Sequence, residues 1–124
     1  MPRIPMVAIV DDDMDVRVSI ASLMRSAGYD AAPFASAADL LDSAKLNEAA
    51  VIITDLQMPG MTGLELLDVL RLRGYKTPVV FITAYPEKRT LKQATSAGAV
   101  GFFIKPYDPG ALLDCIDAVL SQPS

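Results

Sequence analysis

Four carboxylates crowd into five positions of the stretch AIVDDDMDV, directly after an apolar run. They are Asp11, Asp12, Asp13 and Asp15. Two unit charges 4 Å apart interact by about 4 kcal/mol at an effective dielectric constant of 20, so neighbouring carboxylates repel strongly. We therefore expect a cation beside them. A hard divalent ion such as Mg²⁺ suits this site, because it takes carboxylate and carbonyl oxygens and keeps several waters.

A calcium-binding loop is the first alternative for the acidic stretch. Asp11, Asp13 and Asp15 match positions 1, 3 and 5 of such a loop. However, position 6 requires glycine and holds Val16, and position 12 requires glutamate and holds Ser22. We reject the calcium loop on these two mismatches.

The strands that must position these side chains are marked by apolar runs at regular intervals. Four runs are strongly apolar, and a fifth is weaker because it contains aspartate and proline. Runs of this kind are typical of strands that are covered on both faces, as in a parallel sheet. They are MVAIV (6–10), AVIIT (50–54), PVVFI (78–82), GFFI (101–104) and the weaker DAAPF (30–34).

Helical patterns separate the five runs. Apolar residues recur at helical spacing from Val16 to Ala27, with Gly28 as a stop, and again from Leu112 to Leu120. Capping signals predict further helices at TGLE (62–65), SAAD (36–39), PEKRTLKQATSAG (86–98) and the Asp108-Pro109 pair, and either Asp13 or Asp15 is predicted to cap the first helix. Alternating strands and helices predict a three-layer α/β sandwich around a parallel sheet.

Chemically active residues follow four of the strands. In parallel sheets, ligands bind beyond the carboxyl ends of the strands, so these residues should meet at one edge. An aspartate there can act as a nucleophile towards phosphorus and form an aspartyl phosphate. A metal ion, a lysine and a hydroxyl group would stabilise charge on the transferring group. The residues are Asp11, Asp12, Asp55, Thr83 and Lys105.

Composition bounds the remaining possibilities. The 124 residues predict one domain, and no apolar run approaches the roughly 20 residues that span a bilayer, so we expect a soluble, cytoplasmic protein without a signal peptide. The single cysteine, Cys115, and the absence of histidine leave only oxygen-based metal binding. A net charge of −4 without a basic cluster argues against direct binding of nucleic acid by this chain.

The chain resembles the receiver domain of two-component response regulators, and its local sequence is similar to that of FixJ-type regulators. The resemblance spans residues 6–120 and makes residues 1–124 a single receiver domain. It implies a flavodoxin-like sheet of order 2-1-3-4-5 with five helices. It also implies a cis bond between Lys105 and Pro106. The matching motifs, in order, are VDDD (10–13), TDLQMPGMTG (54–63), FITA (81–84) and GFFIKPY (101–107).

The resemblance also implies roles for individual residues. Asp55 looks like the phosphoacceptor, with Lys105 and Thr83 contacting the phosphoryl group. Mg²⁺, or Mn²⁺ in its place, would be held by Asp12, Asp55 and the backbone carbonyl of Gln57, and by Asp11 through a water. Phe102 falls at the position of an aromatic switch that turns inward as Thr83 moves. Gln57 and Tyr85 occupy positions that tune hydrolysis, and Tyr85 followed by Pro86 departs from the commoner small or polar residues.

Partners and alternatives follow from the same comparison. Without histidine, the chain needs a histidine kinase or a phosphotransfer protein as donor. We expect a signalling domain rather than an enzyme, with slow self-dephosphorylation and a homodimer contact on the face from the fourth to the fifth helix. A metal-dependent phosphohydrolase would leave Asp55 without a clear role. A degenerate receiver is disfavoured by the intact active residues, and a free-standing regulator and a receiver cut from a longer transcription factor both remain open.

Overall fold

One sheet of five parallel strands forms the centre of the protein. The computed structural model describes residues 4–121, and its strands lie in the order β2-β1-β3-β4-β5. The predicted order is therefore confirmed. The strands are β1 (Met6–Val10), β2 (Asp30–Phe34), β3 (Ala49–Asp55), β4 (Val79–Thr83) and β5 (Gly101–Ile104).

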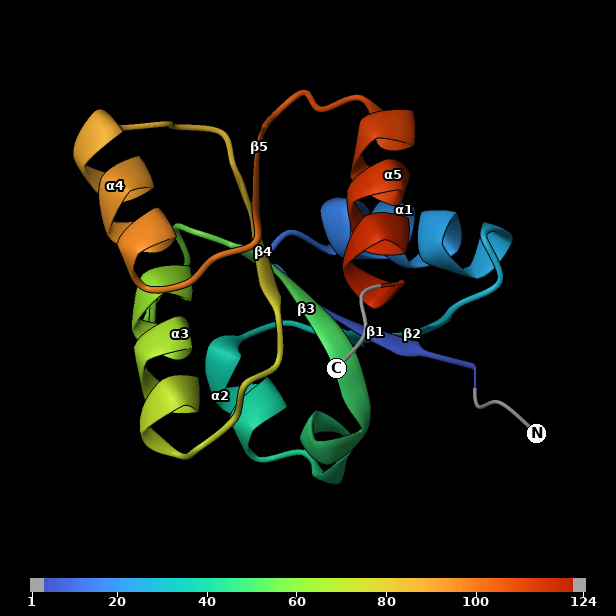
Figure 1. Ribbon diagram of the computed structural model, residues 1–124, viewed down its shortest axis with the longest axis horizontal. Helices are drawn as coiled ribbons and strands as arrows, with labels where there is room; N and C mark the ends of the chain where they lie inside the picture. The colour runs from blue at the N-terminus through green and yellow to red at the C-terminus, as the bar shows by residue number, and fades with distance from the viewer. Residues whose placement is uncertain (1–3, 122–124) are drawn as a thin grey trace.

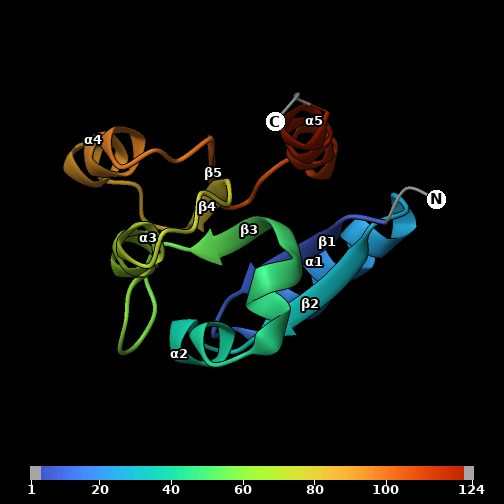
Figure 2. The ribbon, with the colours of Figure 1, turned by 60° about the horizontal axis from the view of Figure 1, so that its bottom comes forward.

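Helices cover both faces of this sheet, as the alternating pattern predicts. Figures 1 and 2 show α1 and α5 on one face and α2, α3 and α4 on the other. A short 3₁₀ helix, η1, adds an element that the sequence did not predict. The helices are α1 (Met14–Ser26), α2 (Ala37–Leu41), η1 (Ala44–Glu48), α3 (Gly63–Leu72), α4 (Lys88–Ser96) and α5 (Pro109–Leu120).

Alternating side chains of the strands feed two separate cores. Along β1, Val7 and Ile9 pack towards α1 and α5, whereas Ala8 and Val10 pack towards α2 and α3. This division follows from the period of two residues in a strand. Because β1, β3 and β4 are covered on both faces, they form a rigid base for the loops at their carboxyl ends.

Local capping signals fix where four α-helices begin. At the start of α2, the Ser36 side chain accepts a hydrogen bond from the N–H of Asp39, as the SAAD stretch predicts. The Asp13 side chain accepts hydrogen bonds from the N–H groups of Asp15 and Val16 at the start of α1, so Asp13 is the cap. Thr62 and Glu65 form a reciprocal capping box at the start of α3, as predicted. The Asp108 side chain accepts from the N–H of Gly110 at the start of α5. These caps place the helix ends that border the sheet edge.

Two sequence predictions about burial and helix bounds are wrong. The β5 run was expected to be fully buried, yet its residues are only half-buried and Ile104 is 48% exposed. The edge strand β2 is likewise only partly buried. An edge strand has one neighbour, so its flank is open to solvent. The fourth helix begins at Lys88, two residues after Pro86, because Glu87 still has extended backbone dihedral angles.

No helix within residues 4–121 is long and apolar enough to cross a membrane.

Candidate functional site

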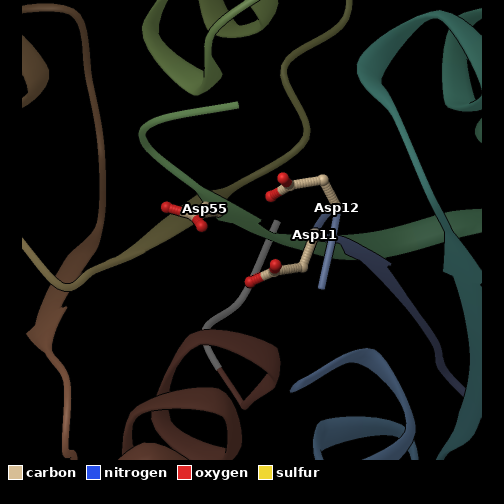
Figure 3. Close-up of side chains that lie close together, drawn as sticks. All are labelled: Asp11, Asp12 and Asp55. Carbon is tan, nitrogen blue, oxygen red and sulfur yellow. The ribbon is translucent and has the colours of Figure 1, made fainter. Parts of the chain in front are cut away.

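Three carboxylates from two adjacent strands meet at the carboxyl edge of the sheet. Asp11 and Asp12 follow β1, and Asp55 is the last residue of β3. Figure 3 shows their side chains pointing towards a common space. One carboxylate oxygen from each lies within 4.8 Å of the others. The β1 and β3 strands flank the point where the strand order reverses, which is where open α/β sheets bind ligands.

Asp11 is the most deeply buried of the three acids, with 1% of its surface exposed. Its Oδ1 accepts a hydrogen bond from the N–H of Asp13 at 2.9 Å. Burial is the main cause that raises the pKa of Asp11, and the nearby charge of Asp55 raises it further. The hydrogen bond from Asp13 and the ammonium group of Lys105 oppose this rise without cancelling it. The site therefore holds a carboxylate that the fold alone does not fully compensate.

Lys105 supplies a positive charge opposite the acids. Its Nζ lies 3.3 Å from Asp11 Oδ2 and 3.4 Å from Asp55 Oδ2. Burial by itself lowers the pKa of Lys105, but the carboxylates of Asp55 and Asp11 together outweigh burial, so the pKa of Lys105 is raised and the ammonium form is favoured. Its backbone N–H donates to the carbonyl of Thr83, and the bond to Pro106 is cis, as the resemblance implied.

Asp55 stands at the mouth of the site with 9% of its surface exposed. Its Oδ1 accepts a hydrogen bond from the N–H of Gln57 at 3.1 Å, and its Oδ2 faces Lys105. The buried hydroxyl of Thr54 donates to the Asp55 backbone carbonyl at 2.9 Å. Gly63 approaches the same carbonyl so closely that a Cβ there would overlap it. Asp55 is thus fixed through its backbone, and its largely buried carboxylate lies at the carboxyl edge of the sheet.

Thr83 lies at the same edge but outside the carboxylate network. It is the last residue of β4 and is fully buried. Its hydroxyl oxygen accepts a hydrogen bond from the N–H of Tyr85 at 3.2 Å. Within residues 4–121, this hydroxyl makes no hydrogen bond to Asp55 or Lys105. The structure places Thr83 at the sheet edge where the sequence predicted it, and its contact with a phosphoryl group stays a prediction.

The two aromatic candidates lie in different environments. Phe102 is half-buried and packs among the side chains on the α2, α3 and α4 face, with its ring centroid 6.3 Å from that of Phe81. Tyr85 is 71% exposed on the loop after β4. Phe102 is therefore in contact with the core in this structure, whereas the Tyr85 side chain projects into solvent.

Sequence reasoning missed Arg17, which reaches the site from α1. Its Nη1 donates to the backbone carbonyl of Asp11 at 2.8 Å. Arg17 lies six residues after Asp11, in the early turns of a helix that starts at the acidic loop. That position could have indicated the contact, because the first turns of the helix pack against the end of β1.

Comparisons with known proteins agree on one family. The family model of the response regulator receiver domain matches residues 7–117. The chain belongs to the response regulator receiver domain family. This receiver is 36% identical to the transcriptional regulatory protein TdiR of Thauera aromatica over 93% of its length and 51% of that protein's. It is also 36% identical to the transcriptional regulatory protein FixJ of Azorhizobium caulinodans, over 98% of the receiver and 58% of FixJ.

Solved structures share the fold of this receiver. The chemotaxis protein CheY4 of Vibrio cholerae superposes with a TM-score of 0.87 at 31% identity, covering 95% of the receiver and all of that chain. The receiver spans about half the length of the curated relatives it matches, and these relatives are named as transcriptional regulators. It is thus a signalling domain of a two-component response regulator.

Proposed function

We propose that Asp55 accepts a phosphoryl group from a histidine kinase or a phosphotransfer protein. A carboxylate oxygen of Asp55 attacks the phosphorus of a phosphohistidine, the P–N bond breaks, and the imidazole leaves with the electron pair and takes up a proton. These 124 residues contain no histidine, so the donor is another molecule. The observation that supports this proposal is the Asp55 carboxylate at the carboxyl edge of the sheet, which faces Lys105 and lies beside two further acids.

The carboxylate set fits a hard divalent cation. Three acids and one lysine leave a net negative charge, and Asp11 is buried without full compensation, so a metal would relieve the repulsion. We assign Asp12, Asp55 and the backbone carbonyl of Gln57 as direct ligands of Mg²⁺, or of Mn²⁺ in its place. Asp11 would bind through a water. When bound, the ion neutralises charge on the phosphoryl oxygens.

Lys105 and Thr83 respond to the phosphoryl group in this proposal. Lys105 already bonds Asp55 Oδ2 and would shift its ammonium group to a phosphoryl oxygen. Thr83 would exchange its hydrogen bond with Tyr85 for one that its hydroxyl donates to another phosphoryl oxygen. This motion frees space beside Phe102, whose ring turns inward as the switch. The phosphorylated state is thus distinguished from the free one by differential contacts.

Hydrolysis and output involve the rim and the face of the domain. Gln57 and Tyr85 are exposed beside the site and would tune attack of water on the phosphoryl group. We expect self-dephosphorylation to be slow. The surface from β4 to α5 carries exposed apolar side chains at Val100 and Ile104. We assign this surface to partner control and to a homodimer contact. The chain acts as one receiver domain, cytoplasmic and without direct contact to nucleic acid.

Incubation with Mg²⁺ and acetyl phosphate, followed by intact mass spectrometry, tests the proposal. We expect one labile phosphate in the wild type, none in Asp55→Asn, and one in the control Asp68→Asn, which changes an exposed acid on α3. Rapid release of phosphate from many unrelated esters without an adduct would support a phosphohydrolase instead. No adduct under any condition would indicate a degenerate receiver that binds partners without phosphorylation.

A further inference from the structure

Arg17 is a cation beside an acidic loop, yet its guanidinium donates a hydrogen bond to a backbone carbonyl. The half-buried guanidinium donates from Nη1 to the backbone carbonyl of Asp11 at 2.8 Å. Among residues 4–121, both ion pairs shorter than 4.0 Å are made by Lys105. Arg17 therefore does not neutralise Asp12, Asp13 or Asp15 by direct pairing. Its geometry suits fixing the backbone of the loop rather than its charge.

The backbone of Asp11 is held through both peptide units that flank its Cα. Its N–H donates to the carbonyl of Phe34, the last residue of β2, at 3.2 Å. Its carbonyl accepts from Arg17 on α1. The peptide unit is planar, so fixing the carbonyl oxygen of Asp11 also fixes the nitrogen and Cα of Asp12. The bond from Arg17 thereby sets the direction in which both neighbouring carboxylates leave the backbone.

We propose that Arg17 is a positioning residue for the metal site, acting through the peptide that joins Asp11 to Asp12. The inference rests on the proposed function, in which these two acids and Asp55 bind Mg²⁺. The direction in which Mg²⁺ affinity changes on losing Arg17 separates this role from a simple charge effect. A cation near three carboxylates repels Mg²⁺, so removing its charge alone would tighten binding. Removing a positioning bond weakens binding, because the ligands then adopt the binding geometry only part of the time.

Titration of metal-free protein with Mg²⁺ by isothermal calorimetry at constant ionic strength measures whether Mg²⁺ binding becomes weaker or tighter. Arg17→Met keeps a long unbranched side chain and loses both the bond and the charge. We expect its dissociation constant to rise on the order of 10-fold, as for other residues that orient metal ligands. Arg25→Met is the matched control, because Arg25 also donates to a carbonyl, that of Ala31, from the opposite end of α1. It should bind Mg²⁺ as the wild type does.

A second measurement reports the loop without metal. Asp13 donates its N–H to Asp11 Oδ1, so this bond depends on where the Asp11 side chain points. In Mg²⁺-free protein, we expect hydrogen exchange at the Asp13 amide to be faster in Arg17→Met and unchanged in Arg25→Met. Exchange at the Gln57 amide, which donates to Asp55 on the other strand, should not change.

The outcomes distinguish this inference from the function on which it rests. If the wild type takes up no Mg²⁺, both fail. If the wild type binds but Arg17→Met binds equally well or more tightly, with unchanged exchange at Asp13, only the positioning role fails. Should Arg17→Met not fold, Arg17→Lys keeps the charge but lacks the planar guanidinium. It should bind Mg²⁺ more weakly than the wild type, and equal binding would overturn the inference.

Discussion

Replacing Asp11 with asparagine should stabilise the metal-free protein while weakening its binding of Mg²⁺. Asp11 is 1% exposed, and the carboxylates of Asp12 and Asp55 have oxygens within 4.8 Å of its own. Burial is the main cause that raises its pKa, so the folded state favours the uncharged form. Asparagine is nearly isosteric, and its Oδ1 can still accept the N–H of Asp13. Lys105 keeps its ion pair with Asp55.

The size of the effect follows from the distances. At an effective dielectric constant of 20, a repulsion over 4.8 Å costs about 3.5 kcal/mol and the attraction to Lys105 over 3.3 Å contributes about 5 kcal/mol. The two repulsions therefore exceed the one attraction by about 2 kcal/mol. Because Asp12 is exposed, solvent screens part of its share. We expect a net gain of about 1 kcal/mol in the free energy of unfolding.

Urea unfolding at pH 7 measures this gain. With EDTA present, the midpoint of Asp11→Asn should lie roughly 0.5–1 M higher than that of the wild type, with the same slope. With Mg²⁺ present, the order should reverse or the gap should close, because the wild type gains more from binding. Asp68→Asn, which changes an exposed acid on α3, should leave the midpoint unchanged in both conditions.

The pH dependence provides the sign of the effect. The pKa of Asp11 is raised above its ordinary value of 3.8, so the folded state binds more protons than the unfolded state between the two values. The destabilisation caused by the charged Asp11 carboxylate is fully present above the pKa of the folded state and is lost as pH falls towards 3.8. The gap between Asp11→Asn and the wild type in EDTA should therefore narrow as the pH is lowered. A variant less stable than the wild type in EDTA, or a gap independent of pH, would refute the electrostatic reasoning.

Three further predictions concern packing and a hydrogen bond. Gly63→Ala should lower the free energy of unfolding by about 2 kcal/mol or more and slow phosphorylation, measured by urea unfolding and intact mass, because its Cβ would overlap the Asp55 carbonyl. Gly101→Ala places a Cβ 2.9 Å from Cys115 Sγ, so it should cost about 1–3 kcal/mol, and adding Cys115→Ala should recover part of that loss in a double-mutant cycle. The Tyr29 hydroxyl donates a hydrogen bond to the Asp117 carboxylate on α5, and this bond raises the pKa of Tyr29 from 10.0 to about 12. Because this pair is exposed, solvent reduces its contribution below the roughly 1 kcal/mol of a typical hydrogen bond. The contribution should hold below pH 10 and be lost as pH rises through about 12, and Tyr29→Phe should abolish this dependence.

Much of the fold could be predicted from the sequence because its signals are local. The apolar runs of β1, β3 and β4 are buried on both faces, and such strands need no knowledge of their neighbours to be recognised. The capping box of Thr62 and Glu65 joins residues only three apart. The convergence of Asp11, Asp55 and Lys105 followed from strand ends in a parallel sheet, and the structure places them within bonding distance.

Other features depended on contacts between distant parts of the chain. The run GFFI reads as a buried strand, but β5 lies at the edge of the sheet and leaves Ile104 half exposed. The 3₁₀ helix η1 and the late start of α4 carry weak local signals, so the packing of the surrounding chain decides them. An apolar run in the sequence does not show whether the strand lies at the edge of the sheet, with one flank open to solvent.

The sequence by itself determined that acidic residues, a lysine and a hydroxyl would follow the strands of a parallel sheet, because the apolar runs and the residues that follow them can be identified directly in the chain. Only the tertiary structure decided how each one is used. Asp11 and Asp12 are neighbours of identical chemistry, yet Asp11 is buried against Lys105 and Asp12 faces solvent. That difference arises because the Asp11 N–H pairs with the carbonyl of Phe34 on β2 and its carboxylate pairs with Lys105 after β5, which are contacts between segments that lie far apart in the sequence.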